Sequence, residues 1–226
     1  FYTVLALCCM EETPCKWVST HRRHHTHSDD DEKDPHSPVV RFFWGHMEWL
    51  VKTRNGRPEM RMDDRLAKDL LDDPFYRQLE KKWWLSPAIY VAHAVLFYLA
   101  ALLIALPFHD SLSAAIWTAA GATMWGVVLR TVAVWHITWS VNSLGHTFGY
   151  QNYSTGEKSR NNWFVALIAS GEGWHNNHHH DPASASVQHK WWEFDLTYYN
   201  IKLLEWCGLA KNVIKPRHVR HRERNS

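Results

Sequence analysis

Residues 85–107 read LSPAIYVAHAVLFYLAALLIALP, a stretch that contains no Asp, Glu, Lys or Arg. As a helix, about 20 apolar residues suffice to cross the ~30 Å hydrocarbon layer of a membrane. A second apolar stretch runs from about 112 to 137 and is interrupted only by Arg130 and His136. Because only the short segment PFHDS separates the two stretches, the sequence predicts a transmembrane helical hairpin over about residues 84–137.

The same pattern also fits a pair of buried core helices in a soluble bundle. Lipid is favoured because the first stretch has no charge along its length and begins at Trp83 and Trp84, a residue type that is enriched at membrane interfaces. No Lys or Arg lies between Trp83 and Leu129. The positive-inside bias therefore predicts that both ends of the hairpin face the cytoplasm.

The composition points to one domain and to metal chemistry. The chain has 226 residues, and its 25 Lys or Arg against 23 Asp or Glu give a net charge of +2, so no nucleic-acid partner is expected. It has 17 His, a residue that serves chiefly in metal ligation and proton transfer. The four Cys show no CxxC spacing, which argues against thiolate-bound metal. The chain opens at Phe1 inside an apolar run, and we expect at least one upstream segment to be missing.

Histidines gather in three short motifs. HRRHH and HNNHH have the same i, i+3, i+4 spacing, which places three imidazoles on one face of a helix. Between them, NSLGH places an Asn and a His on one face at i, i+4. The residues concerned are His21, His24, His25, Asn142, His146, His175, His178 and His179.

The predicted hairpin brings these motifs together, because it returns the chain to the side of the membrane that it left. Seven imidazoles exceed what one tetrahedral zinc ion can use. They suit two transition-metal ions held by neutral nitrogen ligands, and iron is the most plausible metal. One such box alone could be surface polarity or an adventitious metal-binding tract. The remaining histidines are expected to be structural or solvated: His27, His36, His46, His93, His109, His136, His180, His189, His218 and His221.

With these motifs the sequence resembles the membrane-bound fatty acyl desaturases, in particular the acyl-CoA Δ9 type and its bacterial relatives. The resemblance rests on HRRHH followed by SD and DPHSP, on TWSVNSLGH and on GEGWHNNHH, and it covers almost the whole chain. It implies an all-α integral membrane protein with four spans. It also implies a cytoplasmic helical cap that carries a di-iron site and a narrow, kinked tunnel for the acyl chain. Residues 1–226 would then form a single desaturase domain that is incomplete at its N-terminus.

The resemblance also implies roles for individual residues. The seven imidazoles of the three motifs match metal ligands of the family, and Asn142 matches a residue that reaches a metal through water. Trp17, Thr138 and Trp139 fall where the family lines its tunnel near the bend. Lys52 and Arg54 fall near the place where acyl-CoA enzymes bind the headgroup phosphates.

Two departures from the family pattern bear on activity and substrate. The family's first box, HxxxxH, has no counterpart upstream, so this chain supplies seven of nine imidazoles and is not expected to be active alone. Ser19 and Thr20 replace a charged pair that is usual in acyl-CoA desaturases. The acyl carrier therefore stays open between CoA, a lipid and acyl carrier protein.

The predicted reaction is O2-dependent insertion of a cis double bond, at Δ9 by resemblance, with water as the by-product. Because the chain has no flavin, haem or iron–sulfur motif, its electrons should come from a ferredoxin-type or cytochrome-type donor. A di-iron hydroxylase or ketolase acting on lipids or carotenoids is an alternative. A non-catalytic metal-binding or metal-transporting membrane protein is disfavoured, because transporters need ligands within their spans and only His93 and His136 lie there.

Overall fold

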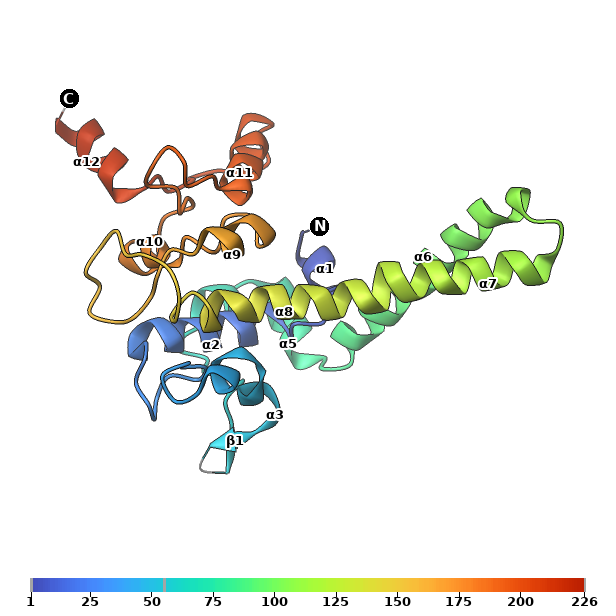
Figure 1. The fold of residues 1–226 in the computed structure, drawn as a ribbon, viewed down its shortest axis with the longest axis horizontal. Helices are drawn as coiled ribbons and strands as arrows, with labels where there is room; N and C mark the ends of the chain where they lie inside the picture. Colours follow the sequence, from blue (N-terminus) through green and yellow to red (C-terminus); the bar gives the residue numbers. More distant parts are fainter. Residues whose placement is uncertain (1, 55, 226) are drawn as a thin grey trace. The chain divides into compact units, whose positions relative to one another are not determined.

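The computed structural model describes residues 2–54 and 56–225, and these residues form two compact units. The first unit comprises residues 2–22 and 60–136, and the second comprises residues 23–59 (without residue 55) and 137–225. Both units are mostly helical (Figure 1). Among the described residues, the only strands are β1 (Thr53–Arg54) and β2 (Arg57–Pro58), which pair antiparallel. The mostly helical character that the sequence predicted is therefore confirmed.

Two long apolar helical stretches dominate the first unit. α6 (Leu85–Ala105) continues into the 3₁₀ turn η2 (Leu106–Phe108). After a short connection, α7 (Leu112–Thr123) begins at Ser111, whose side chain caps the helix by accepting a hydrogen bond from Ala114 N (3.2 Å). α6 and α7 lie side by side (Figure 1). Both stretches, Leu85–Phe108 and Leu112–Ser143, are long and apolar enough to cross a membrane.

The surface of α6 argues against a soluble core. Only 6% of its most apolar window is buried, and Leu96, Leu103 and Ile104 are each about two-thirds exposed. A core helix of a soluble bundle would bury such side chains, because each leucine gains about 1.5–3 kcal/mol on leaving water. The helix pair therefore presents to its surroundings the apolar surface that a lipid layer would cover.

The second apolar stretch is longer than the sequence predicted. A π-helical turn, η3 (Met124–Leu129), joins α7 to α8 (Arg130–Ser143), so the helix continues past 137. No proline or glycine interrupts 130–143, and the chain leaves the helix only near Gly145, where a Cβ would lie 2.1 Å from Val141 O. Thr138, Trp139 and Asn142 therefore belong to the last turns of α8.

The remaining helices of the first unit are short and are fixed by polar contacts. Trp135 Nε1 donates to Cys9 O (2.7 Å) and the Arg130 guanidinium donates to Cys8 O (3.0 Å), so the second apolar stretch holds the chain just after α1. Asp73 caps α5 by accepting from Phe75 N (2.7 Å). These helices are α1 (Tyr2–Leu7), the first part of α2 (Pro14–His27), α4 (Lys68–Leu71) and α5 (Pro74–Lys81).

The second unit is built from short helices around a polar interior. Its buried side chains include His24, Asn161, His175 and Glu193, each 0–1% exposed. Such groups are stable in an interior only when their polar atoms are paired. Besides the ends of α2 and α8, its helices are η1 (Trp44–Glu48), α3 (Trp49–Val51), α9 (Trp163–Ile168), α10 (His175–His180), α11 (Leu196–Trp206) and α12 (Arg217–Asn225).

Candidate metal centre

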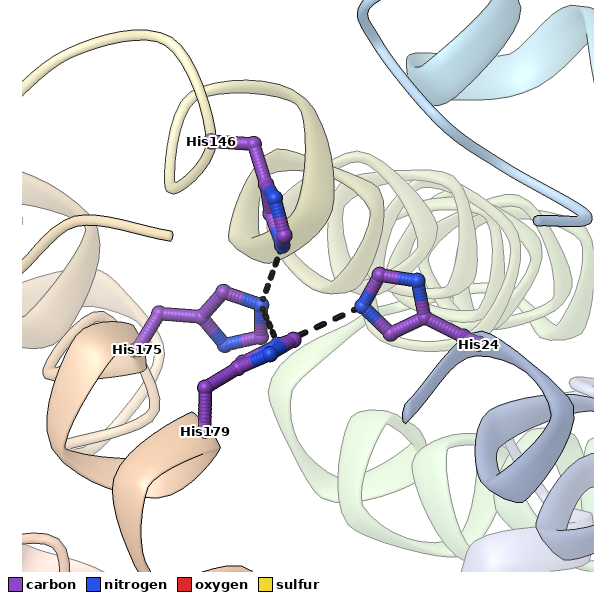
Figure 2. Close-up of side chains that lie close together, drawn as sticks. All are labelled: His24, His146, His175 and His179. Carbon is purple, nitrogen blue, oxygen red and sulfur yellow. Dashed lines mark hydrogen bonds between the residues drawn. The ribbon is translucent and has the colours of Figure 1, made fainter. Parts of the chain in front are cut away.

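Four imidazoles converge in the second unit (Figure 2). His24 comes from the last turns of α2, His146 follows α8, and His175 and His179 lie one turn apart on α10. The Nε2 atoms of His146 and His179 each lie 3.0 Å from His175 Nε2, and His24 Nε2 lies 3.3 Å from His179 Nε2. These four side chains can each offer one nitrogen within 4.8 Å of all the others.

Carboxylates stand behind three of these four rings. His24 Nδ1 lies 2.9 Å from Asp34 Oδ1, and His146 Nδ1 lies 3.2 Å from Asp29 Oδ1. His179 Nδ1 lies 3.7 Å from Glu157 Oε1. A carboxylate next to Nδ1 keeps the proton on that nitrogen and leaves the lone pair on Nε2. His24 and His146, whose Nδ1 atoms lie within hydrogen-bond distance of their carboxylates, therefore direct their Nε2 lone pairs into one small space, and the Nε2 atom of His179 lies there too.

This arrangement fits a transition-metal ion. Lone pairs held about 3 Å apart repel one another unless a cation or a proton lies between them. Two nitrogen ligands at right angles around an ion, each about 2.1 Å from it, are themselves about 3 Å apart. The observed separations of 3.0–3.3 Å agree with that value. Nitrogen donors without thiolates suit iron among other first-row metals.

The loop after α2 connects two of the carboxylates. Asp29 N donates to Asp34 Oδ2 (2.8 Å), and His36 N donates to Asp34 Oδ1 (3.1 Å). Asp29 Oδ2 also accepts from Lys158 N (2.6 Å). Burial, the largest single influence, raises the pKa of Asp29. The hydrogen bond from His146 and smaller contributions from His146 and Lys158 together outweigh burial, so the pKa lies below its usual value. The loop thus orients ligands from two distant segments at once.

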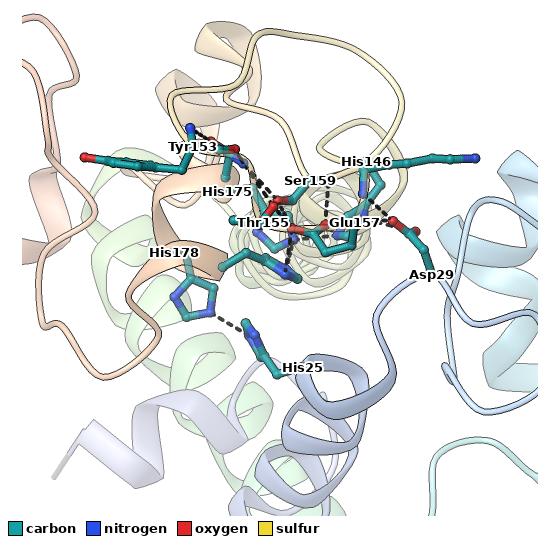
Figure 3. Close-up of polar contacts among 12 residues, drawn as sticks. His25, Asp29, His146, Tyr153, Thr155, Glu157, Ser159, His175 and His178 are labelled. Carbon is teal, nitrogen blue, oxygen red and sulfur yellow. Dashed lines mark hydrogen bonds and ion pairs between the residues drawn. The ribbon is translucent and has the colours of Figure 1, made fainter.

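A second pair of imidazoles lies beside the first group (Figure 3). His25 Nε2 is 2.9 Å from His178 Nε2, and the ring of His25 lies 4.4 Å from that of His179 between centroids. Burial lowers the pKa of His178 to about 3 and that of His25 to about 4, and the pKa of His175 falls well below its usual value for the same reason. These rings are therefore neutral near pH 7, which is the form that binds metal.

The asparagines of HNNHH hold α10 in place. Asn176 Oδ1 accepts from the backbone N–H groups of Asn152 (2.8 Å) and Tyr153 (2.9 Å). Asn177 donates through Nδ2 to Glu193 Oε2 (2.7 Å) and accepts through Oδ1 from Asn161 (2.9 Å). Glu193 also accepts from Tyr150 OH and from the backbone N–H groups of His189 and Lys190. This buried network fixes α10, the helix that carries three of the candidate ligands.

Glu157 is fixed in a similar way (Figure 3). Its carboxylate accepts from Ser159 N (2.5 Å), from Ser159 Oγ (2.6 Å) and from Thr155 Oγ1. Glu157, Asp29 and Asp34 were not predicted as partners of the histidines, although both aspartates stand in the segment that follows HRRHH. Asp29 reaches His146 across 117 residues of chain, and Asp34 folds back onto His24 through a ten-residue loop, so no helical spacing encodes these contacts.

Two further predicted ligands, His21 and Asn142, lie outside the group of four. His21 lies one turn before His25 on α2, in the first unit, and its ring stacks on Trp17 (4.8 Å between centroids). Asn142 lies in the last turn of α8, and its backbone oxygen accepts from His146 N (3.1 Å). His36, which was expected to be structural or solvated, is buried with its ring 4.3 Å from that of His24, and it forms a candidate metal-binding group with His24 and Asp34.

The predicted substrate contacts stay predictions. Trp139 packs edge-on against His46 (5.9 Å between centroids), and Thr138 beside it is half-buried. Lys52 forms an exposed ion pair with Glu48 (2.7 Å). Arg54 is more enclosed: it donates to Asp34 O (3.1 Å), and its guanidinium lies over the ring of Trp44.

Comparison with known proteins identifies the family. A family model described as fatty acid desaturase matches residues 1–204, which is most of the chain. The chain belongs to the fatty acid desaturase family. A relative from Anemone leveillei named acyl-CoA 5-desaturase is 38% identical over 223 residues, 99% of this chain and 63% of the relative.

Other relatives are named for a different acyl carrier and a different double-bond position. The sn-1 stearoyl-lipid 9-desaturase of Anabaena variabilis is 40% identical over 203 residues, 88% of this chain and 65% of its own length. The chloroplastic palmitoyl-monogalactosyldiacylglycerol delta-7 desaturase of Arabidopsis thaliana is 41% identical over 212 residues, 92% of this chain and 50% of its own length. The chain thus spans about half to two-thirds of these desaturases.

Proposed function

We propose that the protein acts as an O2-dependent fatty acyl desaturase that places a cis double bond, at Δ9, in a saturated acyl chain. The convergence of the Nε2 lone pairs of His24, His146 and His179, each ring with a carboxylate behind it, is the observation that carries this proposal. Membership of the desaturase family supports it.

Two ions would share the histidines. His24, His146, His175 and His179 would hold one ion, and His21, His25 and His178 would contribute to the other, with Asn142 acting through water. The neutral rings and the small spaces between their nitrogens support this division. When bound, the iron pair would supply, with O2 and two external electrons, the oxidising power needed to remove two hydrogens from an unactivated chain.

The protein itself would position the acyl chain. An acyl chain has no polar group near the reacting carbons, so the depth and bend of its tunnel must select them. Trp17, Thr138 and Trp139 would shape the bend, while Lys52 and Arg54 would bind the headgroup. The relatives act on acyl-CoA or on acyl lipids, so either carrier fits this family.

The exposed apolar helices imply a membrane setting. α6 and the stretch α7–α8 would cross the bilayer as a hairpin in a multi-pass protein, with the second unit as a cap on the cytoplasmic side. The low burial of α6 and the absence of Lys and Arg between Trp83 and Leu129 support this orientation. A ferredoxin-type or cytochrome-type donor would then reach the cap from the cytoplasm.

Product analysis tests the proposal. Membranes containing the full-length protein would be supplied with stearoyl-CoA or stearoyl lipid, a reductant and O2, and the acyl products would be identified by mass spectrometry. The proposal predicts a new cis double bond that requires O2. A hydroxylated product would indicate the oxygenase alternative, and unchanged substrate with bound metal would indicate a non-catalytic metal-binding protein.

A further inference from the structure

A strongly basic segment is attached to the end of the ligand-bearing helix. Residues 211–224 contain six Lys or Arg and one Glu. Asp181, which directly follows His180, accepts from Arg217 N (2.7 Å) and from the Arg220 guanidinium (2.9 Å to each oxygen). Asp181 N in turn donates to Asn177 O at the end of α10 (3.1 Å). One buried carboxylate therefore joins α12 to α10.

Three of the cations that the structure describes in this segment are exposed. Lys211, Lys215 and Arg217 are exposed, whereas Arg220 is half-buried against Asp181. Three positive charges within seven residues attract an acidic surface over about 8–10 Å at physiological ionic strength. Such charge complementarity raises the rate at which two proteins associate.

A row of rings leads from this segment to α10. The ring of His218 on α12 lies 5.1 Å from that of His189 between centroids, and His189 Nδ1 lies 2.8 Å from Tyr153 OH. Tyr153 stacks on His180 with centroids 3.7 Å apart and planes 6° from parallel. His180 directly follows His179 in the chain, and His179 Nε2 lies 3.0 Å from His175 Nε2 in the group of four imidazoles. Van der Waals and covalent contacts thus connect the basic surface to a candidate ligand.

We propose that Lys211, Lys215 and Arg217 form the docking surface for an acidic one-electron carrier protein. Electrons would then pass along His218, His189, Tyr153 and His180 to the metal site. The proposal rests on the proposed function. Reduction of O2 to two water molecules takes four electrons and four protons: the two C–H bonds of the acyl chain provide two of each, the carrier provides two electrons in separate encounters, and solvent provides two protons.

The row of rings favours a carrier protein over an anionic lipid surface as the occupant. Lipid headgroups would also bind a basic segment. They would have no use for a continuous contact from that segment to a metal ligand, whereas a carrier must deliver its electron there.

The docking test uses the full-length protein and the triple variant Lys211→Glu, Lys215→Glu and Arg217→Glu. The control triple, Lys33→Glu, Arg61→Glu and Lys68→Glu, makes the same change in charge at exposed sites elsewhere. Binding is measured with a redox-inert, gallium-substituted acidic plant-type ferredoxin, so the result does not depend on activity. We expect Kd to rise at least tenfold in the first variant and less than twofold in the control.

Turnover separates docking from catalysis. Driven by reduced ferredoxin, the first variant should lose at least tenfold in kcat/KM; driven by a small chemical reductant, it should stay within twofold of the wild type. Equal ferredoxin affinity in all three proteins would overturn the proposal, and so would loss of binding to anionic vesicles instead of ferredoxin. Wild-type protein that binds ferredoxin but desaturates with neither reductant would overturn the proposed function and leave the docking surface standing.

The row of rings has its own pair of variants. Tyr153→Leu removes the stacked ring, whereas Tyr153→Phe keeps it. Ferredoxin affinity should stay unchanged in both variants. In stopped-flow absorbance, reduced ferredoxin should reduce the metal site of the Leu variant at least fivefold more slowly than that of the wild type, and the Phe variant should keep most of the wild-type rate. Equal rates in both variants would remove Tyr153 from the path.

Discussion

The helices α6 and α10 distribute polarity in opposite ways. α6 turns leucines such as Leu96, which is 67% exposed, toward the outside, and only 6% of its most apolar window is buried. α10 instead buries its polar residues: His175 is 1% exposed, and Asn176 and Asn177 are 0% exposed. In a soluble protein both distributions would be costly, the first in exposed apolar surface and the second in desolvated polar groups.

Each helix therefore indicates the surroundings that complete it. The outward leucines of α6 are stable beside lipid, and the asparagines of α10 are already satisfied by Glu193 and Asn161. The Nε2 atoms of His175 and His179 on α10 lie 3.0 Å apart, and a cation between them would stabilise this arrangement. The surface of α6 is thus suited to lipid and the histidines of α10 to a metal ion, and substitutions can test each of these two expectations separately.

Removal of a ligand on α10 should have the largest effect. His178→Ala in the full-length protein should abolish desaturation and lower bound iron, because His25 would lose the nitrogen that lies 2.9 Å away. Product analysis and iron determination measure the two effects. His27→Ala is the matched control in the neighbouring box and should keep both. Full activity with retained iron in the His178 variant would remove this box from the mechanism.

A charge on the outward face of α6 should have the next largest effect. Leu96→Arg places a cation near the middle of the span, which costs about 2.5–3.5 kcal/mol in membrane insertion. Insertion measured by glycosylation mapping should fall strongly, while Leu96→Ile should insert as the wild type does. Normal insertion of the arginine variant would show that α6 does not face lipid.

Loss of a carboxylate behind a ligand should be milder. Asp34→Asn weakens the orientation of His24 and should reduce metal affinity about 10–100-fold, the usual effect of altering such a partner. Iron retained during dialysis against a chelator measures it. The exposed neighbour Asp31→Asn is the control and should retain iron normally. Equal retention in both variants would mean that Asp34 does not orient the ligand.

Regular spacing in the sequence was enough to predict the candidate ligands and the apolar helices. The histidines of α2 and α10 follow the spacing i, i+3, i+4, and the apolar run of α6 is recognised by its length alone, so both features could be predicted from the sequence. Asp34, Glu157 and Glu193 were not, because each meets its partner through loops whose path depends on the whole unit. The π-helical turn at Met124–Leu129 escaped prediction because its residues simply continue the apolar run. The extension of α8 past 137 escaped because the apolar run ends there, and residues 138–143 (TWSVNS) are mostly polar.

The smallest effect is expected near the end of α8. Trp139→Ala should leave iron in place and change chain-length preference or double-bond position, because the wide indole would shape the acyl tunnel. Mass spectrometry of the products from acyl chains of several lengths measures it. Trp206→Ala, which alters an exposed tryptophan of α11, should give the wild-type pattern. Identical products from the Trp139 variant would contradict the tunnel assignment.

X-ray absorption at the iron edge of the purified full-length protein tests the central claim most directly. If imidazoles from α2, α10 and the segment after α8 share a pair of ions, the iron content should be two per chain. The spectrum should then show nitrogen neighbours at about 2.1 Å, together with the outer-shell scattering of several histidine rings. A single ion per chain, or a spectrum of oxygen neighbours without imidazole scattering, would contradict it.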